Sequence, residues 1–268
     1  MGDIVNHLEG AVRDAFRESE SMSETTPVRR VERVRHELKR RALQVARVED
    51  LSPHFRRITF TGADLADFVS ASFDDHVKLF FDATPGAGPA RRDYTPRSYD
   101  NATRELVIEF ALHEAGPATE WAAQAAPGQT LAVGGPKGSF IVPLDYDWHL
   151  FVGDETALPA VARRLEQLPA GARAIAILLA ADAADQRRFT TAAAADITWV
   201  ADATALLAAV RALALPAGAG YAWCAGEAAA IAAVRQVLVA DKGHPREAIR
   251  AAAYWKRGAA DHHENLEG

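Results

Sequence analysis

Two segments of the chain place the start of a helix directly after a strand, an arrangement that can hold phosphate. In GPATEWAAQ, Gly116 breaks a strand and Pro117 opens the helix. The first turn of a helix has free backbone N–H groups and a positive dipole end, which suit a pyrophosphate, and Thr119 adds a hydroxyl. In FVGDETALPAVARRL, the turn at 153–156 opens a phosphate or ribose site in the same way. Each pattern alone is weak, because Trp121 is equally typical of a core and acidic turn residues also serve as helix caps.

A third segment, RRDYTPRSYD, has arginines on both sides of a Tyr-Thr pair. On a strand, residues two apart face the same way. We therefore expect one face to carry Arg92, Tyr94 and Pro96, and the other to carry Asp93, Thr95 and Arg97. These side chains either line a binding site or cover the outside of a sheet, and the segment by itself supports both interpretations.

The composition and the absence of certain motifs exclude several kinds of binding site and reaction. The chain has 268 residues, of which 49% are hydrophobic, enough for two domains of roughly 100–200 residues each. A net charge of -6 gives no general attraction for nucleic acid or an anionic membrane. Cys224 is the only cysteine, so the chain can form neither a dithiol couple nor a cysteine-ligated cluster. The nine histidines lack metal-ligand spacing, so we expect no metal site.

Two stretches with different residue patterns predict two domains. Residues 42–143 contain about six short runs rich in β-branched and aromatic residues, separated by turn signals, which predicts a small antiparallel barrel or sandwich. Over 144–258, apolar strands such as WHLFVGD and RAIAILLAA alternate with amphipathic helices. This alternation predicts a parallel sheet covered on both faces, which binds ligands at the carboxyl ends of its strands.

The ends of the chain stand apart from both domains. Apolar residues recur at helical spacing in two places: Ile4, Leu8, Val12 and Phe16, and then Val31, Val34 and Leu38 within a basic run. We expect a helical and basic extension over 1–41, most simply a solvated surface, and a tail over 259–268. There is no signal-peptide pattern and no apolar run long enough to span a bilayer. With the single cysteine, this favours a cytoplasmic protein.

In combination, and in this order, the segments resemble the siderophore-interacting proteins, the FAD-dependent ferric-siderophore reductases of the ferredoxin-reductase superfamily. Residues 92–97 match that family's R-x-Y-T-x-R, and LHEAGPATEWA is similar to its His, Gly-Pro-Ala and Trp segment. GDETALPA looks like its nucleotide-side strand end, and AYWKRG looks like its C-terminal Tyr-Trp segment. The resemblance covers about 42–264. It implies an N-terminal antiparallel Greek-key FAD-binding β-barrel, followed by a parallel-sheet NAD(P)-binding α/β domain.

The resemblance also implies roles for single residues. At the flavin ring, Tyr94 and Thr95 are the expected catalytic positions, with Tyr94 against the ring, Thr95 bonded to its edge and Trp255 over the other face. Arg92 and Arg97 are expected to hold the phosphate side of FAD. The remaining FAD contacts are expected from Ser98, His113, Gly116, Pro117, Ala118, Thr119 and Trp121. The nicotinamide nucleotide is expected at Asp154, Glu155, Thr156, Ala157 and residues 224–227. An anionic ferric siderophore is expected at Lys256 and Arg257.

The implied chemistry joins a two-electron donor to a one-electron acceptor. NADPH or NADH delivers a hydride, whereas Fe³⁺ accepts one electron, and a flavin converts one transfer into the other. Hard oxygen ligands suit Fe³⁺ better than Fe²⁺, so reduction releases the iron. Asp182 or Asp185 would hold a ribose hydroxyl and favour NADH, whereas Arg187 or Arg188 would hold a 2′-phosphate and favour NADPH.

Two other functions remain open at this point. One is a general NAD(P)H flavin oxidoreductase with a non-iron acceptor. The other is a ferric-chelate binding protein without redox chemistry. Whichever of these functions holds, we expect the protein to be a monomer with no nucleic-acid partner and no stable membrane insertion.

Overall fold

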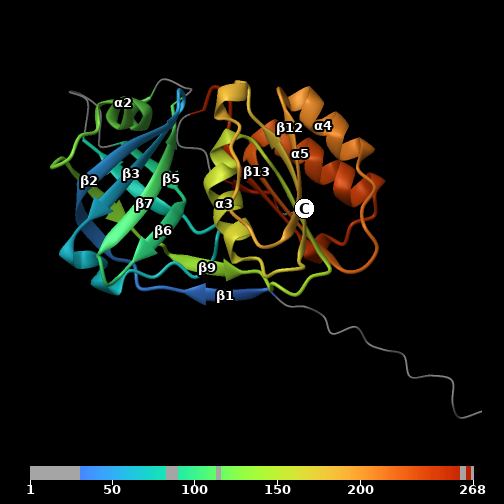
Figure 1. Cartoon of the computed structure of the whole chain (residues 1–268), viewed down its shortest axis with the longest axis horizontal. Helices are drawn as coiled ribbons and strands as arrows, with labels where there is room; N and C mark the ends of the chain where they lie inside the picture. Colours follow the sequence, from blue (N-terminus) through green and yellow to red (C-terminus); the bar gives the residue numbers. More distant parts are fainter. Residues whose placement is uncertain (1–30, 83–89, 113–115, 260–263, 267–268) are drawn as a thin grey trace, which may run out of the picture. The chain divides into compact units, whose positions relative to one another are not determined.

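A computed structural model of the chain describes residues 31–82, 90–112, 116–259 and 264–266. From Val31 onward the chain gathers into one compact unit. Within it, an antiparallel sheet precedes a mostly parallel sheet with helices (Figure 1). We call these parts the barrel lobe (β2 to β8) and the α/β lobe (β10 to β15). The order predicted from the sequence is confirmed, whereas the helix expected over 4–16 lies outside the described residues.

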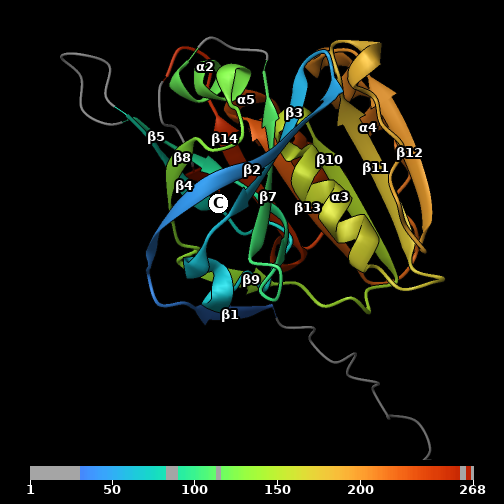
Figure 2. The same cartoon turned by 60° about the vertical axis from the view of Figure 1, so that its left-hand side comes forward.

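The barrel lobe is a seven-stranded antiparallel sheet that curls around an apolar core. Its strands are β2 (Arg40–Ser52), β3 (Phe55–Thr61), β4 (Val77–Phe81), β5 (Ala90–Tyr94), β6 (Pro96–Asp100), β7 (Glu105–Ala111) and β8 (Thr130–Gly134), in the order β5-β4-β8-β2-β3-β7-β6. Buried residues alternate along the strands, as Leu43 and Val45 do on β2. Helix α2 (Pro117–Gln124) covers one end of the lobe (Figures 1 and 2), and the 3₁₀ turn η1 (Ala63–Asp67) follows β3.

The segment RRDYTPRSYD forms two strands rather than the single one expected. Strand β5 pairs with β4, and β6 pairs with β7 at the opposite edge of the sheet, with Thr95 between them. Pro96 cannot donate a ladder hydrogen bond, and the register shifts between Pro96 and Ser98. The strict alternation expected from Arg92 to Arg97 is therefore wrong beyond Thr95.

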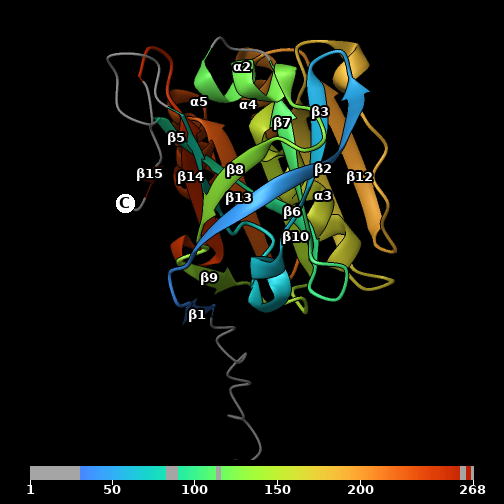
Figure 3. The same ribbon diagram turned by 90° about the vertical axis from the view of Figure 1, so that its left-hand side faces the viewer.

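The helix expected at Val31, Val34 and Leu38 is also not formed. Glu32–Arg35 is instead strand β1, which pairs antiparallel with β9 (Gly138–Ile141). This small sheet lies at the end of the barrel lobe opposite α2 (Figure 3). The pairing depends on Gly138, because a Cβ there would lie 2.5 Å from the Val34 carbonyl oxygen. Strand β2 then begins at Arg40.

The α/β lobe has the predicted alternation of strands and helices. Its strands are β10 (Trp148–Gly153), β11 (Arg173–Leu179), β12 (Ala194–Val200), β13 (Gly220–Glu227), β14 (Ile249–Trp255) and β15 (Glu264–Asn265), and its α-helices are α3 (Leu158–Gln167), α4 (Ala203–Ala212) and α5 (Ala228–Gln236). Short turns are the 3₁₀ segments η2 (Glu155–Ala157), η3 (Ala183–Asp185) and η5 (Arg246–Ala248), and the π turn η4 (Val237–Asp241). The strand order is β12-β11-β10-β13-β14-β15, and only β15 runs antiparallel to its neighbour.

The two faces of the parallel sheet have different partners. Leu150 and Val152 of β10 pack in a core with α4 and α5, whereas Phe151 packs with α3 on the other face. Phe55 and Phe73 of the barrel lobe are fully buried in the same core as α3. Helix α3 therefore lies between the barrel lobe and the sheet (Figure 1), and the lobes share an apolar interface. None of the helices in the described part of the chain has the length and hydropathy needed to cross a bilayer.

Candidate functional site

We call residues 92–97 the arginine-tyrosine motif. On the barrel lobe, strand β5 carries its first half. The Tyr94 ring packs 4.4 Å from the Phe110 ring, centroid to centroid. Burial raises the pKa of the Tyr94 phenol, and Arg92 opposes that rise, so the phenol stays protonated at neutral pH. Arg92 is half-buried, and its Nη1 donates to the Arg91 carbonyl oxygen at 2.8 Å. The chain therefore presents a neutral aromatic ring next to a guanidinium that has no carboxylate partner among the described residues.

Helix α2 begins close to this strand, and its first turn has no side-chain cap. It packs against β3, β4, β5 and β7. Gly116 is its N-cap and provides no capping side chain, and a Cβ there would meet no described atom within 4 Å. Pro117 has no N–H, and the N–H groups of Ala118 and Thr119, in the first turn, have no partner within the helix itself. An uncapped helix start beside Arg92 fits an anionic pyrophosphate.

Trp121 and His113 are two further residues that the sequence predicts as FAD contacts. Trp121 lies among the barrel aromatics, with its ring 6.0 Å from those of Phe60 and Phe110 and 5.8 Å from that of Phe81. It packs as a core residue here, which is one of the two interpretations that the sequence leaves open. The expected FAD contact His113 lies outside the described residues.

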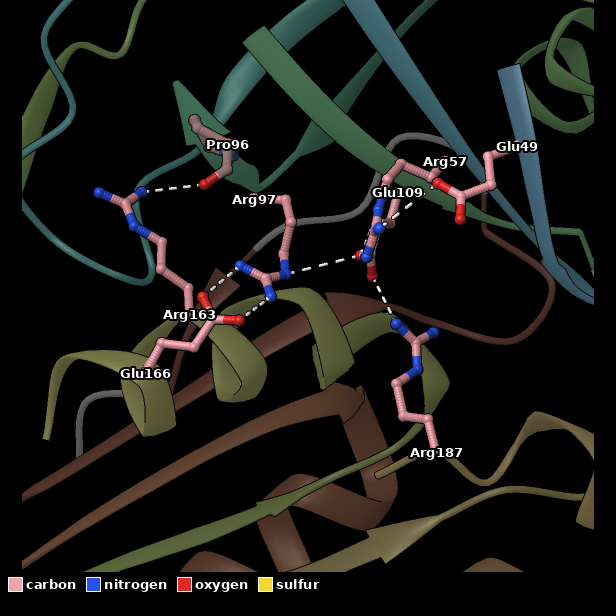
Figure 4. Close-up of polar contacts among 8 residues, drawn as sticks. All are labelled: Glu49, Arg57, Pro96, Arg97, Glu109, Arg163, Glu166 and Arg187. Atoms are coloured by element: carbon pink, nitrogen blue, oxygen red, sulfur yellow. Dashed lines mark hydrogen bonds and ion pairs between the residues drawn. The ribbon is translucent and has the colours of Figure 1, made fainter. Parts of the chain in front are cut away.

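Three consecutive residues after Tyr94 contact the α/β lobe. The buried Thr95 side chain lies beside that of Tyr254 on β14. The Pro96 carbonyl oxygen accepts from Arg163 Nη1 at 2.9 Å, and Arg97 donates with both Nη1 and Nη2 to the Glu166 carboxylate (Figure 4). Arg163 and Glu166 both belong to α3, so the motif meets this helix and the end of β14 together.

Glu109 of β7 is the centre of a larger ion cluster at the same boundary. Its side chain is fully buried and accepts from Arg57 Nη2 at 2.8 Å and Arg187 Nη1 at 2.6 Å, and Arg97 Nε lies 3.5 Å away (Figure 4). Burial would raise the pKa of Glu109, but Arg187 and Arg57 hold it below its ordinary value. For Arg97, burial would lower the pKa, but Glu166 and Glu109 raise it overall. Glu109 and Arg97 therefore both stay charged near neutral pH.

Asp154 joins the carboxyl ends of three neighbouring parallel strands. Its Oδ1 accepts from the Thr156 N–H at 3.0 Å and the Thr156 hydroxyl at 2.5 Å. Its Oδ2 accepts from the Glu227 N–H and from Trp255 Nε1, both at 2.8 Å. Gly226 allows this approach, because its φ is +149° and a Cβ there would lie 2.5 Å from Asp154 Oδ2. Asp154 thus holds the strand ends and Trp255 in place, and its oxygens already have four donors.

Some of the other residues expected to contact the nucleotide lie in a core, and the rest lie nearer the surface. Ala157 and Cys224 are fully buried in the two cores, and burial raises the pKa of the Cys224 thiol to about 12. A nucleotide contact at these two positions would therefore have to come from the backbone. Glu155 accepts from the Ala181 N–H at 2.9 Å, and Glu227 caps α5 through Ala229 and Ala230.

Three residues predicted to bind ligands are exposed. Lys256 and Arg257 follow the end of β14, directly after Trp255. Ser98 lies on β6, beyond the break at Thr95. The two cations therefore lie at the carboxyl end of the parallel sheet, where a charged small molecule can reach them.

The loop after β11 contains the residues that the sequence suggests for selectivity between NADH and NADPH, and they differ in their positions. Asp185 is buried and bonds to the barrel lobe through Ser52 Oγ at 2.5 Å and His54 Nδ1 at 2.9 Å. Arg187 is held by Glu109, with its guanidinium 4.5 Å from the Phe55 ring centroid. Asp182 caps η3, and Arg188 is exposed. Asp185 and Arg187 therefore serve the contact between the lobes, and Asp182 and Arg188 are left for a ligand.

Three residues of this region were missed from the sequence: Glu109, Arg163 and Glu166. Glu109 had a signal, since it is the one carboxylate within the apolar run LVIEFAL, opposite Arg57 in the β3–β7 register. Arg163 and Glu166 lie on the charged part of an amphipathic helix, where solvated residues are the rule.

Comparisons with known proteins agree with this geometry. The profile of the siderophore-interacting protein family matches residues 146–258, and that of the siderophore-interacting FAD-binding domain matches 44–90 and 82–140. The NADPH-dependent ferric-chelate reductase of Escherichia coli K12 is 39% identical over 84% of this chain and 96% of its own.

Two solved structures extend the comparison. The crystal structure of a siderophore utilization protein from T. fusca is 35% identical, covers 86% of this chain and 98% of its own, and has a TM-score of 0.80. The ferredoxin reductase of carbazole 1,9a-dioxygenase is 17% identical over 79% of this chain and 66% of its own, with a TM-score of 0.61, and shows a common fold. The chain therefore has the ferredoxin-reductase fold and belongs to the siderophore-interacting protein family.

Proposed function

We propose that this protein is an NADPH-dependent ferric-siderophore reductase that carries FAD on its barrel lobe. The observation that carries the proposal is the position of Thr95, which is buried beside Tyr254 of β14. It places the arginine-tyrosine motif of the barrel against the carboxyl end of β14, where Asp154 also holds Trp255. Ligands of open α/β sheets bind at such strand ends, so a flavin and a nicotinamide would meet at this point.

The residues on the barrel side supply complementary parts of an FAD site. Arg92 and the uncapped start of α2 at 116–119 would hold the phosphates, because a guanidinium and free N–H groups both favour anionic oxygens. Tyr94, supported by Phe110, would lie along the ring, and Thr95 would bond to its edge. When bound, FAD accepts two electrons as a hydride and passes them on one at a time.

On the α/β side, the proposal assigns the nucleotide to the ends of β10, β11 and β13. Arg188 is exposed and has no ion pair among the described residues, whereas Arg187 is held by Glu109. We therefore assign the 2′-phosphate of NADPH to Arg188. The relative from Escherichia coli, which is named as NADPH-dependent, supports this choice of nucleotide.

The iron substrate needs a cationic approach and no protein ligands. Ferric siderophores are often anionic, and Lys256 and Arg257 are exposed just after Trp255. One NADPH and two chelated Fe³⁺ ions would give NADP⁺, one proton and two Fe²⁺ ions. The oxygen ligands of a siderophore hold Fe²⁺ less well, so the iron is released.

The same proposal covers the organisation and setting of the chain. We propose domain boundaries at 42–143 for the FAD-binding barrel and 144–258 for the nucleotide-binding domain, with 1–41 as an extension and 259–268 as a tail. We also propose a monomer in the cytoplasm, where NADPH is available.

An anaerobic absorbance experiment tests the function. The purified protein, reconstituted with FAD if necessary, should show oxidised-flavin bands that bleach with NADPH and return when a ferric siderophore is added. Bleaching without reoxidation by the ferric siderophore would point to a flavin oxidoreductase with a different acceptor. A protein that stays colourless after reconstitution would overturn the proposal, and a ferric-chelate binding protein would then be the better explanation.

A further inference from the structure

The second half of the arginine-tyrosine motif, residues 95–97, contacts the α/β lobe. Thr95 lies beside Tyr254 on β14, whereas Pro96 and Arg97 bond to Arg163 and Glu166 on α3. Arg163 is itself buried and donates to the Ser70 carbonyl oxygen at 2.7 Å, which ties α3 to a second segment of the barrel lobe. Three residues in a row thus form one continuous contact with one helix and one strand end.

The two arginines of the motif differ in their partners. Arg97 uses both terminal nitrogens on Glu166, and its Nε lies 3.5 Å from the Glu109 carboxylate. Its side chain is only 12% exposed. Among the residues that the structure describes, Arg92 donates to the carbonyl oxygen of its neighbour Arg91 and pairs with no carboxylate. A phosphate would have to displace a bidentate carboxylate to reach Arg97, whereas it would displace no ion pair at Arg92.

Arg97 already faces carboxylates on two sides. Figure 4 draws the charged side chains at this place, which are the cations Arg57, Arg97, Arg163 and Arg187 and the anions Glu49, Glu109 and Glu166. Two of these anions, Glu109 and Glu166, lie within 3.5 Å of the Arg97 guanidinium. A phosphate placed there would meet two negative charges at close range, and the desolvation of its own charge would be poorly compensated.

We propose that residues 95–97 are a joint that fixes the α/β lobe against the barrel lobe, and that Arg97 is a positioning residue rather than a phosphate ligand. This inference rests on the proposed function, because the distance that the joint would set is that between the flavin and the nicotinamide. Residue 95 directly follows Tyr94, so a movement of α3 or β14 is transmitted to the flavin contact through a single peptide bond.

The joint matters because hydride transfer depends steeply on geometry. Reacting atoms must lie about 3–3.5 Å apart, and a misplacement of about 1 Å can reduce a rate about 100-fold. Loss of the Arg97–Glu166 contact removes one of several links between the lobes, since the apolar interface at Phe73 remains. We therefore expect a partial effect, about a tenfold slower hydride transfer, with the FAD site intact.

The decisive variant is Glu166→Gln, because Glu166 lies on α3 and belongs to no proposed binding site. Its matched control is Glu105→Gln, which removes an equally bidentate ion pair, Arg47–Glu105, that stays within the barrel lobe. Three quantities are measured for each: the Kd of FAD from flavin fluorescence, the anaerobic rate of flavin reduction across NADPH concentrations, and amide hydrogen exchange of the apoprotein. Arg92→Ala serves as the reference for a lost phosphate contact.

The expected result separates rate from binding. Glu166→Gln should lower the limiting rate of flavin reduction about tenfold, with the FAD Kd and the half-saturating NADPH concentration within about twofold of wild type. In the apoprotein it should speed exchange in α3 and β6, and Glu105→Gln should do neither. Weakened FAD binding in Arg97→Lys, together with an unchanged limiting rate in Glu166→Gln, would overturn the proposal.

A failure of the joint can be distinguished from a failure of the proposed function. If wild-type protein bound no FAD, the function would fail, and the exchange experiment would still decide whether Glu166 links the lobes. If wild-type flavin were reduced normally and Glu166→Gln behaved like Glu105→Gln in both rate and exchange, the joint alone would be refuted.

Discussion

Replacing Glu109 by Gln should be the most destabilising single-charge change in the contact between the lobes. The side chain is 0% exposed and faces three guanidinium groups, those of Arg57, Arg97 and Arg187, whose side chains are 32%, 12% and 19% exposed. Glutamine has the same shape but no charge, and its NH₂ would point a donor at a donor. Breaking a buried ion pair by removing one partner costs about 3–5 kcal/mol. Because the arginine side chains stay partly exposed to solvent, we expect a loss of unfolding free energy at the lower end of this range, about 3 kcal/mol.

The pH dependence provides a second, independent readout. Arg187 and Arg57 lower the pKa of Glu109 from its ordinary value of 4.5. A carboxyl whose pKa is lower in the folded state stabilises the fold fully above its unfolded pKa, and this contribution disappears as the pH falls through the folded value. The difference in unfolding free energy between wild type and Glu109→Gln should thus be largest at neutral pH and shrink below about pH 4.5.

Urea unfolding of the apoprotein across this pH range measures both quantities. Glu105→Gln is the control, since its partner Arg47 is exposed and the pair should matter far less. A loss below about 0.5 kcal/mol for Glu109→Gln at neutral pH would refute the reasoning, because that is the size expected at an ordinary surface site. A larger loss that stayed constant down to acidic pH would show that shape, and not charge, holds the cluster together.

Three further predictions follow from single contacts. Arg92→Ala should raise the Kd of FAD about 10- to 100-fold in a fluorescence titration, because it removes a charge-assisted bond worth about 1.5–3 kcal/mol; an unchanged Kd would place the phosphates elsewhere. Gly226→Ala should lower the Tm by about 4–8 °C, because strain from the +149° φ and the clash with Asp154 costs about 2 kcal/mol; a Tm equal to wild type in calorimetry would contradict this. Cys224, with a pKa raised to about 12, should resist a thiol reagent at mildly alkaline pH until denaturant is added; rapid labelling of the native protein would show that the core opens.

The sequence was most informative where one property repeats along an element. Leu43 and Val45 lie on either side of the polar Gln44 on β2, and Phe151 lies in the apolar run 150–152 of β10. These patterns predict a half-exposed antiparallel sheet and a fully covered parallel sheet, because the side-chain period directly reflects which faces are buried. The strand ends at Gly153 and Glu227 could then be located as a site by a topological rule alone.

The sequence was least informative where a partner lies far away along the chain. Val34 fits a helical spacing as well as a strand, and only the pairing of β1 with β9, in which Val34 lies opposite Ser139, decides between them. Arg97 and Glu166 are 69 residues apart, and nothing local to either marks them as partners. The resemblance implies a phosphate contact for Arg97, whereas we propose a positioning role, because a motif records which residue types occur together and not which atoms they bond.

The break at Thr95 gives this motif two functions that mutagenesis would easily confuse. Arg92 and Tyr94 lie on a strand paired with β4, whereas Arg97 lies on a strand paired with β7 and bonds to α3. Loss of activity in a variant on either side of the break would look the same in a steady-state assay. Because a ligand contact changes the Kd of FAD and a positioning contact changes the limiting rate, the two sides differ only when binding and reduction are measured separately. The position of Thr95, between two strands at opposite edges of the sheet, is what makes this separation possible.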